Sequence, residues 1–125
     1  MVSDLVLPRL YAFDVDDTLE VSDGPVTVAA LRALVEDGQI VGLCGNWSVF
    51  VRAIPDWHRV VSFLGPFHVT KADFLVQLRL HVPAGAYVMV GNDPTTGRGS
   101  SEDRAAAEQA GWRFILEANF ATGER

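Results

Sequence analysis

Apolar and polar residues alternate along this chain in two patterns, short continuous apolar runs and longer segments with apolar residues at helical spacing. Short apolar runs bounded by turn residues are typical of buried strands, and they occur at residues 10–13, 39–43, 59–64, 86–90 and 112–116. Apolar residues along one helical face predict helices at residues 27–37, 47–54, 70–80 and 101–110. Strands that alternate with helices form right-handed β-α-β units. We therefore expect an α/β fold with a parallel sheet and helices on both faces.

The composition narrows the class of protein. The chain has 125 residues, of which 49% are hydrophobic and 21% charged, and this predicts a single domain over residues 1–125 rather than a disordered chain. Its only cysteine, Cys44, excludes a disulfide framework. No apolar run approaches the roughly 18 residues of a membrane span, and the start lacks a signal-peptide pattern, so a cytoplasmic setting is the default expectation. The net charge of −6 disfavours nucleic acid as a partner.

The first predicted strand ends in an acidic cluster, formed by Asp14, Asp16 and Asp17. Chemistry in parallel α/β sheets lies at the carboxyl ends of the strands. Carboxylates that leave a buried strand together repel one another unless a hard cation such as Mg²⁺ binds them. A calcium loop that starts at Asp14 is excluded, because its sixth and twelfth positions hold Leu19 and Pro25 instead of glycine and an acid. Two interpretations stay open: a solvated acidic turn, and a phosphoryl-transfer site with an aspartate nucleophile.

Residues 13–19, Phe-Asp-Val-Asp-Asp-Thr-Leu, resemble the first motif of the haloacid dehalogenase superfamily, Asp-x-Asp-x-Thr. The resemblance implies a three-layer α/β sandwich around a five-stranded, mostly parallel sheet, with Mg²⁺ as the cofactor. It also implies that Asp14 is the nucleophile, that Asp16 is the general acid and base, and that Thr18 is the turn residue in the substrate site. In such a site Asp14 binds the metal through its carboxylate and Asp16 binds it through its backbone carbonyl.

The second and third motifs of this family fall at Gly45 and Lys71. Gly45 stands where the family has a serine or threonine that holds a phosphate oxygen, so we expect the backbone N–H groups of Gly45 and Asn46 to face the substrate instead. Cys44, among apolar neighbours, is expected to be a core residue and not a nucleophile. Lys71 is the only lysine of the chain. It stands where the family's lysine neutralises the aspartates and the bound phosphate, so we predict a catalytic and substrate-binding role for it.

The fourth motif resembles the family less closely. After the fourth predicted strand come Gly91, Asn92 and Asp93, with Asn92 where the family most often has an aspartate, and Asp103 opens the helix that follows a stretched loop. In the family this motif supplies the third protein ligand of the metal. Asp93 carries the charge that Mg²⁺ favours and lies next to the strand end, so we predict that it is this ligand. Asn92 is the alternative, and Asp103 is expected to act through a water molecule or as an acid at the helix start.

Many members of the family carry a cap domain, and the segments where it is inserted are short here. Residues 20–26 form only a turn, and residues 47–70 are filled by one helix and one strand. The resemblance then implies a capless, open site that acts on phosphorylated macromolecules or, in a homo-oligomer, on small phosphate esters. Two hypotheses follow. The first is a Mg²⁺-dependent phosphohydrolase with an aspartyl-phosphate intermediate. The second, motivated by Gly45 and Asn92, is a weakly active or inactive domain that binds a partner.

Overall fold

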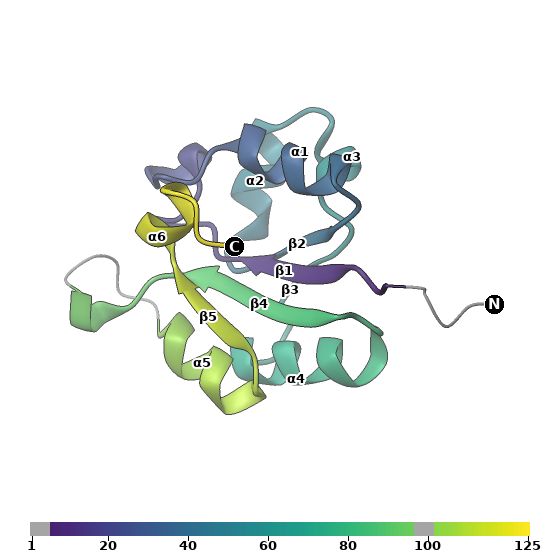
Figure 1. Ribbon diagram of the computed structural model, residues 1–125. Coiled ribbons are helices and arrows are strands. Elements are labelled where there is room, and N and C mark those ends of the chain that lie inside the picture. The colour runs from purple at the N-terminus through teal and green to yellow at the C-terminus, as the bar shows by residue number, and fades with distance from the viewer. Residues whose placement is uncertain (1–5, 97–101) are drawn as a thin grey trace.

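A five-stranded parallel sheet forms the centre of the protein (Figure 1). The computed structural model describes residues 6–96 and 102–125. The strands are β1 (Arg9–Phe13), β2 (Ile40–Cys44), β3 (Leu64–Gly65), β4 (Ala86–Gly91) and β5 (Arg113–Leu116). They lie in the order β3-β2-β1-β4-β5, and each neighbouring pair is parallel. The α/β class and the parallel sheet are therefore confirmed.

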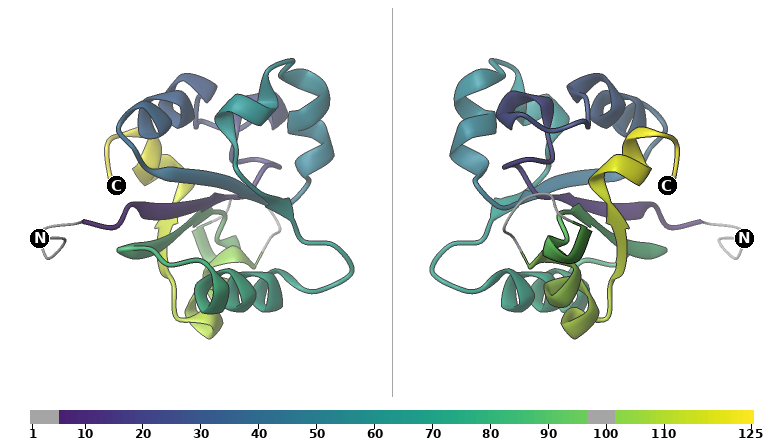
Figure 2. Two further views of the ribbon diagram at one scale, coloured as in Figure 1. Left: turned by 90° about the vertical axis from the view of Figure 1, so that its right-hand side faces the viewer. Right: turned by 90° about the vertical axis from the view of Figure 1, so that its left-hand side faces the viewer.

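Helices cover both faces of the sheet, as the alternation predicted (Figures 1 and 2). One face carries α1 (Val28–Glu36), α2 (Trp47–Ala53), α3 (Trp57–Val60) and α6 (Glu117–Ala121), and the other carries α4 (Lys71–His81) and α5 (Asp103–Ala110). Two short 3-10 helices, η2 (Glu20–Ser22) and η3 (Pro94–Thr96), follow β1 and β4. Successive side chains of a strand point to opposite faces. Tyr11 and Phe13 therefore join the first core, whereas Leu10 and Ala12 join the second.

The helix ends follow from capping residues that the sequence makes visible. The side-chain oxygens of Thr27 and Thr70 accept the N–H groups of Ala30 and Asp73, each at 3.1 Å, and so start α1 and α4. Gly111 ends α5 in the left-handed conformation, with φ 77°. The predicted helix at 101–110 corresponds to α5, although residue 101 lies outside the described residues.

The strand predicted at residues 59–64 is wrong except at its last residue. Residues 57–60 form α3, and the strand itself is only Leu64–Gly65 at the edge of the sheet. Ser62 N–H nevertheless donates to Val41 O (2.7 Å), so the chain already runs along β2 before β3 begins. Periodicity cannot distinguish a short apolar run in a strand from one in a buried helix. Helix α6 is not predicted from the sequence, because its five residues are too few to show a helical stripe.

No cap domain is present among the described residues. Leu19 and Val26 pair in a single bridge within the connection from β1 to α1. Between β2 and β3 the chain forms only α2 and α3, which pack against the first core through residues such as Phe50 and Val60. In this described part of the chain, no helix is long and apolar enough to cross a membrane.

Candidate active site

Three charged side chains from distant parts of the chain meet at the carboxyl end of the sheet. Asp14 follows β1, Lys71 is the first residue of α4, and Asp103 is the first residue of α5. The Lys71 ammonium binds Asp14 Oδ1 at 2.8 Å and Asp103 Oδ1 at 2.7 Å. The side chains of Asp14 and Asp103 are 2% and 0% exposed, and the two buried carboxylates share the Lys71 ammonium, whose side chain is 26% exposed. The structure thus brings together Asp14 and Lys71, as predicted, and places Asp103 in direct contact with Lys71.

The amide of Asn92 lies beside the Asp14 carboxylate and the Asp16 carbonyl, the two groups that are predicted to bind the metal. One of the two terminal atoms of the Asn92 side-chain amide, nitrogen or oxygen, lies 2.7 Å from Asp14 Oδ2 and 2.9 Å from the carbonyl oxygen of Asp16. Without a cation, an amide nitrogen at this position donates to both oxygens. With the amide oxygen there instead, three oxygen atoms converge, and a bound cation would satisfy all three. Thr18 borders the same place, since its Oγ1 lies 3.4 Å from Asp14 Oδ2.

Asp93, the predicted third ligand, is turned away from this point. Its carboxylate accepts the Thr95 N–H (3.0 Å), the Thr95 hydroxyl (2.8 Å) and the Arg104 Nε (2.6 Å). The hydrogen bonds from Thr95, followed by those from Arg104, lower the pKa of Asp93 below its usual value. The geometry therefore favours Asn92, the alternative in the sequence analysis, over Asp93. Among the described residues no three His, Cys, Asp or Glu side chains gather into a metal-binding group, so a metal here depends on an amide and a backbone carbonyl.

Burial and the neighbouring charges set the protonation of the site. Burial, reinforced by the negative charge of Asp103, raises the pKa of Asp14 to about 7, although Lys71 acts in the opposite direction. Burial alone would lower the pKa of Lys71, but Asp14 and Asp103 outweigh it and raise that pKa above its usual value. Lys71 therefore stays charged at neutral pH, whereas Asp14 without a bound cation is balanced between its two protonation states. Cys44 is fully buried, and burial raises its pKa to about 12, which agrees with a core role.

Asp16 lies on the open side of the site. It is exposed, and its carboxylate accepts the Ser22 hydroxyl at 2.8 Å and the Asn46 amide at 3.4 Å. The next residue, Asp17, has φ 58°, and this left-handed turn reverses the chain directly after Asp16. The carboxylate of Asp16 thus stands at the surface while its carbonyl faces inward. This is the arrangement that a group needs if it exchanges protons with a bound substrate and with water.

Gly45 leaves room for the Asp14 carboxylate, a role that is not predicted from the sequence. Its N–H donates to Gly65 O at 2.9 Å, so the expectation that this group faces an anion is wrong. A Cβ at position 45 would overlap Asp14 Oδ1, and a Cβ at Gly91 would overlap the Asp103 carboxylate. Glycine at the ends of β2 and β4 therefore leaves the space that the two buried carboxylates occupy.

The substitution Gly45→Ala should lower any activity that depends on Asp14 while the protein still folds. The added methyl group must displace the Asp14 carboxylate, and a displacement of about 1 Å in a catalytic group can cost about a hundredfold in rate. Turnover and the melting temperature should be measured on the same preparation. Wild-type turnover in Gly45→Ala would mean that the position of Asp14 is not critical.

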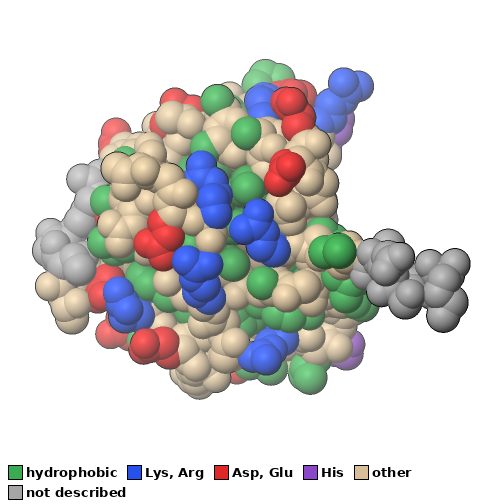
Figure 3. All heavy atoms as spheres, in the orientation of Figure 1, with side chains coloured by type: hydrophobic (Ala, Val, Ile, Leu, Met, Phe, Trp, Pro, Cys, Tyr) green, Lys and Arg blue, Asp and Glu red, His purple; other side chains and the backbone are tan. Residues whose placement is uncertain are grey.

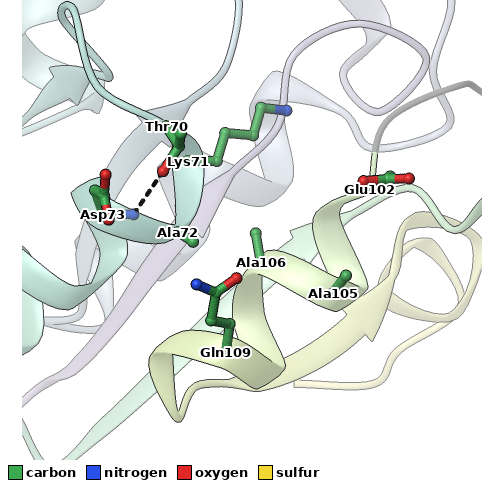
Figure 4. A pocket seen from close by; sticks show the side chains of 8 residues that line it. All are labelled: Thr70, Lys71, Ala72, Asp73, Glu102, Ala105, Ala106 and Gln109. Atoms are coloured by element: carbon green, nitrogen blue, oxygen red, sulfur yellow. Dashed lines mark hydrogen bonds between the residues drawn. The ribbon is translucent and has the colours of Figure 1, made fainter.

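A pocket of about 520 Å³ lies beside the cluster, between α4 and α5 (Figure 4). It is lined by Thr70, Lys71, Ala72, Asp73, Glu102, Ala105, Ala106 and Gln109. The Lys71 side chain extends away from this pocket in Figure 4, toward its partners Asp14 and Asp103. The other charged groups of the pocket, Asp73 and Glu102, are acidic and would repel a phosphate. The reacting group is therefore expected on the side of Lys71 that faces Asp14.

Comparisons with protein-family models, with curated proteins and with solved structures find no match to this chain.

Proposed function

We propose that this protein is a Mg²⁺-dependent phosphohydrolase of the haloacid dehalogenase type, in which Asp14 forms an aspartyl-phosphate. The observation that carries the proposal is that the buried Asp14 carboxylate meets the partly buried Lys71 ammonium on one oxygen and, on the other, the Asn92 amide beside the Asp16 carbonyl, two groups that can offer oxygen ligands to a cation. A structural ion pair would need only the first two. The resemblance of residues 13–19 and of Lys71 to the motifs of that family supports the same proposal.

The residues around Asn92 fit Mg²⁺. Neighbouring ligands in an octahedral magnesium shell lie about 2.9 Å apart, because each is about 2.1 Å from the ion. Asp14 Oδ2 and the Asp16 carbonyl lie 2.7 and 2.9 Å from the amide position of Asn92, within the range that such a shell requires. These three groups would hold the ion, and water would complete its coordination. When bound, Mg²⁺ would neutralise the Asp14 carboxylate and polarise the phosphate oxygens.

The side chains of the chain itself account for both steps of the reaction. A carboxylate oxygen of Asp14 attacks phosphorus as the bond between phosphorus and the leaving oxygen breaks, and Asp16 donates a proton to that oxygen. Water then attacks the phosphorus of the aspartyl-phosphate, Asp16 takes the proton back, and the bond to Asp14 breaks to release phosphate. Lys71 stabilises the negative charge on the transferring group. Asp103 holds Lys71 in place through the contact at 2.7 Å and through the Asn92 N–H, which donates to its other oxygen at 2.8 Å.

The first test is hydrolysis of p-nitrophenyl phosphate with Mg²⁺ and with a chelator. We expect Mg²⁺-dependent turnover that Asp14→Asn abolishes. The Asp16→Asn variant should lose more rate with an alkyl phosphate than with the nitrophenyl ester, because a poor leaving group depends more on the acid. If several classes of phosphate ester show no turnover with Mg²⁺, the alternative of a non-catalytic binding domain takes precedence.

The third metal ligand gives a separate prediction. We expect Asn92→Ala to weaken Mg²⁺ binding about tenfold or more, the range typical of lost support at a metal site. The matched variant Asp93→Asn should retain nearly the affinity of the wild type, because the carboxylate of Asp93 faces Thr95 and Arg104. Mg²⁺ affinity measured by calorimetry distinguishes the two ligands. The opposite ranking would restore Asp93 as the ligand.

A further inference from the structure

An aromatic pair, of which one ring is exposed and the other half-buried, lies on two chain segments that lead to the proposed site. Trp47 is the first residue of α2, and Phe67 lies in the connection between β3 and α4. Their ring centroids are 5.0 Å apart, with the planes tilted by 42°. Phe67 is 54% exposed, and Val69 in the same connection is 50% exposed. We call Trp47, Phe67 and Val69 the aromatic rim.

Both segments of the aromatic rim lead directly to residues of the site. The Trp47 N–H donates to Gly45 O at 2.8 Å, and Gly45 packs against the Asp14 carboxylate. Phe67 belongs to the connection that ends at Lys71, whose ammonium binds Asp14. Figure 2 shows this connection leaving the sheet at the β3 edge and returning to the start of α4. The aromatic rim therefore lies on the two chain segments that supply Gly45 and Lys71 to the site, on the side of β2 and β3.

We infer that the aromatic rim binds the alcohol part of the substrate, and that the substrate is a small phosphate ester whose alcohol carries an aromatic ring. The inference rests on the proposed function, because it takes the phosphate to be anchored between Asp14 and Lys71. We expect an ester held there to direct its alcohol part toward solvent, since the side chains of Asp14 and Lys71 are only 2% and 26% exposed. A ring on that alcohol covers exposed apolar surface and stacks on Phe67 or Trp47. With no cap domain among the described residues, the substrate's own ring is the group that excludes water from this side.

The experiment compares benzyl phosphate with ethyl phosphate in the presence of Mg²⁺. Both release a primary alcohol, so the difference between them reports on the ring rather than on the leaving group. We expect kcat/KM for benzyl phosphate to exceed that for ethyl phosphate by about three- to tenfold, mainly through a lower KM, as stacking energies predict. In Phe67→Ala this ratio should fall to about one. The control Leu80→Ala removes a similarly exposed side chain (70%) from the last turn of α4 and should keep the wild-type ratio.

Each other outcome overturns the inference in a recognisable way. Equal kcat/KM values for the two esters, or a ratio that Phe67→Ala does not change, would refute the aromatic rim as a substrate site while leaving the phosphohydrolase intact. If benzyl phosphate, ethyl phosphate and p-nitrophenyl phosphate are all left unhydrolysed, the proposed function is refuted, and the inference with it. A wild-type protein that elutes as a dimer and becomes monomeric in Phe67→Ala would identify the rim as a contact between copies of the chain.

Discussion

The substitution Asp14→Asn should abolish turnover and, in the absence of Mg²⁺, make the protein more stable. A folded-state pKa of about 7 for Asp14, against 3.8 in the unfolded chain, means that ionising this carboxyl costs stability. The folded protein therefore loses stability as the pH rises from about 4 through about 7, and it regains none above that. Asparagine keeps the shape without the charge. The gain should be on the order of 2–4 kcal/mol at pH 8 and smaller at pH 5.

Thermal or urea unfolding at pH 5 and pH 8, in a buffer with a chelator, measures this effect. Asp56→Asn is a control with the opposite sign. The hydrogen bonds from Arg32 lower the pKa of Asp56 to about 2, so its stabilising charge is present at both pH values. We expect Asp56→Asn to lower stability slightly and equally at pH 5 and pH 8. If Asp14→Asn behaved like Asp56→Asn, Asp14 would be a stabilising member of an ion pair and not a strained carboxylate.

The second large effect is expected from Lys71→Met. This substitution leaves two carboxylates, 2% and 0% exposed, without the cation that they share. Removing one partner from a buried ion pair typically costs about 3–5 kcal/mol, and here the loss should be larger at pH 8 than at pH 5, where Asp14 takes up a proton. Turnover should be lost as well, because the transferring phosphate has no other described cationic side chain in contact with Asp14.

Urea unfolding of Lys71→Met, with Arg59→Met for comparison, separates this loss from a general effect of removing a positive charge. Arg59 is exposed on α3, and its substitution should change stability by less than about 0.5 kcal/mol. The double variant Asp14→Asn with Lys71→Met should recover part of the lost stability at pH 8. No recovery in the double variant would mean that Asp14 and Lys71 do not interact in the folded protein.

The layered fold could be predicted from the sequence because its signals are local. A strand such as β4 appears as an apolar run, and helices such as α1 and α4 carry a threonine cap that is visible at Thr27 and Thr70. The strand prediction failed at Val60 and Val61. Both side chains lie in the first core, but Val60 is the last residue of α3 and Val61 follows it, since burial in a core does not require a strand. Helix α6 was missed because its position depends on the docking of Phe120 against Tyr11 and Phe13, a contact between distant residues.

Part of the site arrangement was predicted, and the differences between the prediction and the structure share a cause. Asp14 and Lys71 were identified from residue type and position along the chain, and they meet in the structure. Asp93 was chosen over Asn92 because of its charge, but consecutive residues at a strand end point in opposite directions. Only Asn92 faces β1. The role of Gly45 likewise depends on a neighbour from another strand, the Asp14 carboxylate, which no pattern along the chain reveals.

The most direct test of the central claim is to look for a phosphoryl group on Asp14. The protein is mixed with p-nitrophenyl phosphate and Mg²⁺, quenched in acid during turnover, and analysed by peptide mass spectrometry. We predict the mass of one added phosphoryl group on the peptide that contains Asp14, and its absence in Asp14→Asn and in samples with a chelator. Turnover in which no phosphoryl group forms on Asp14, or in which it forms on another residue, would contradict the account.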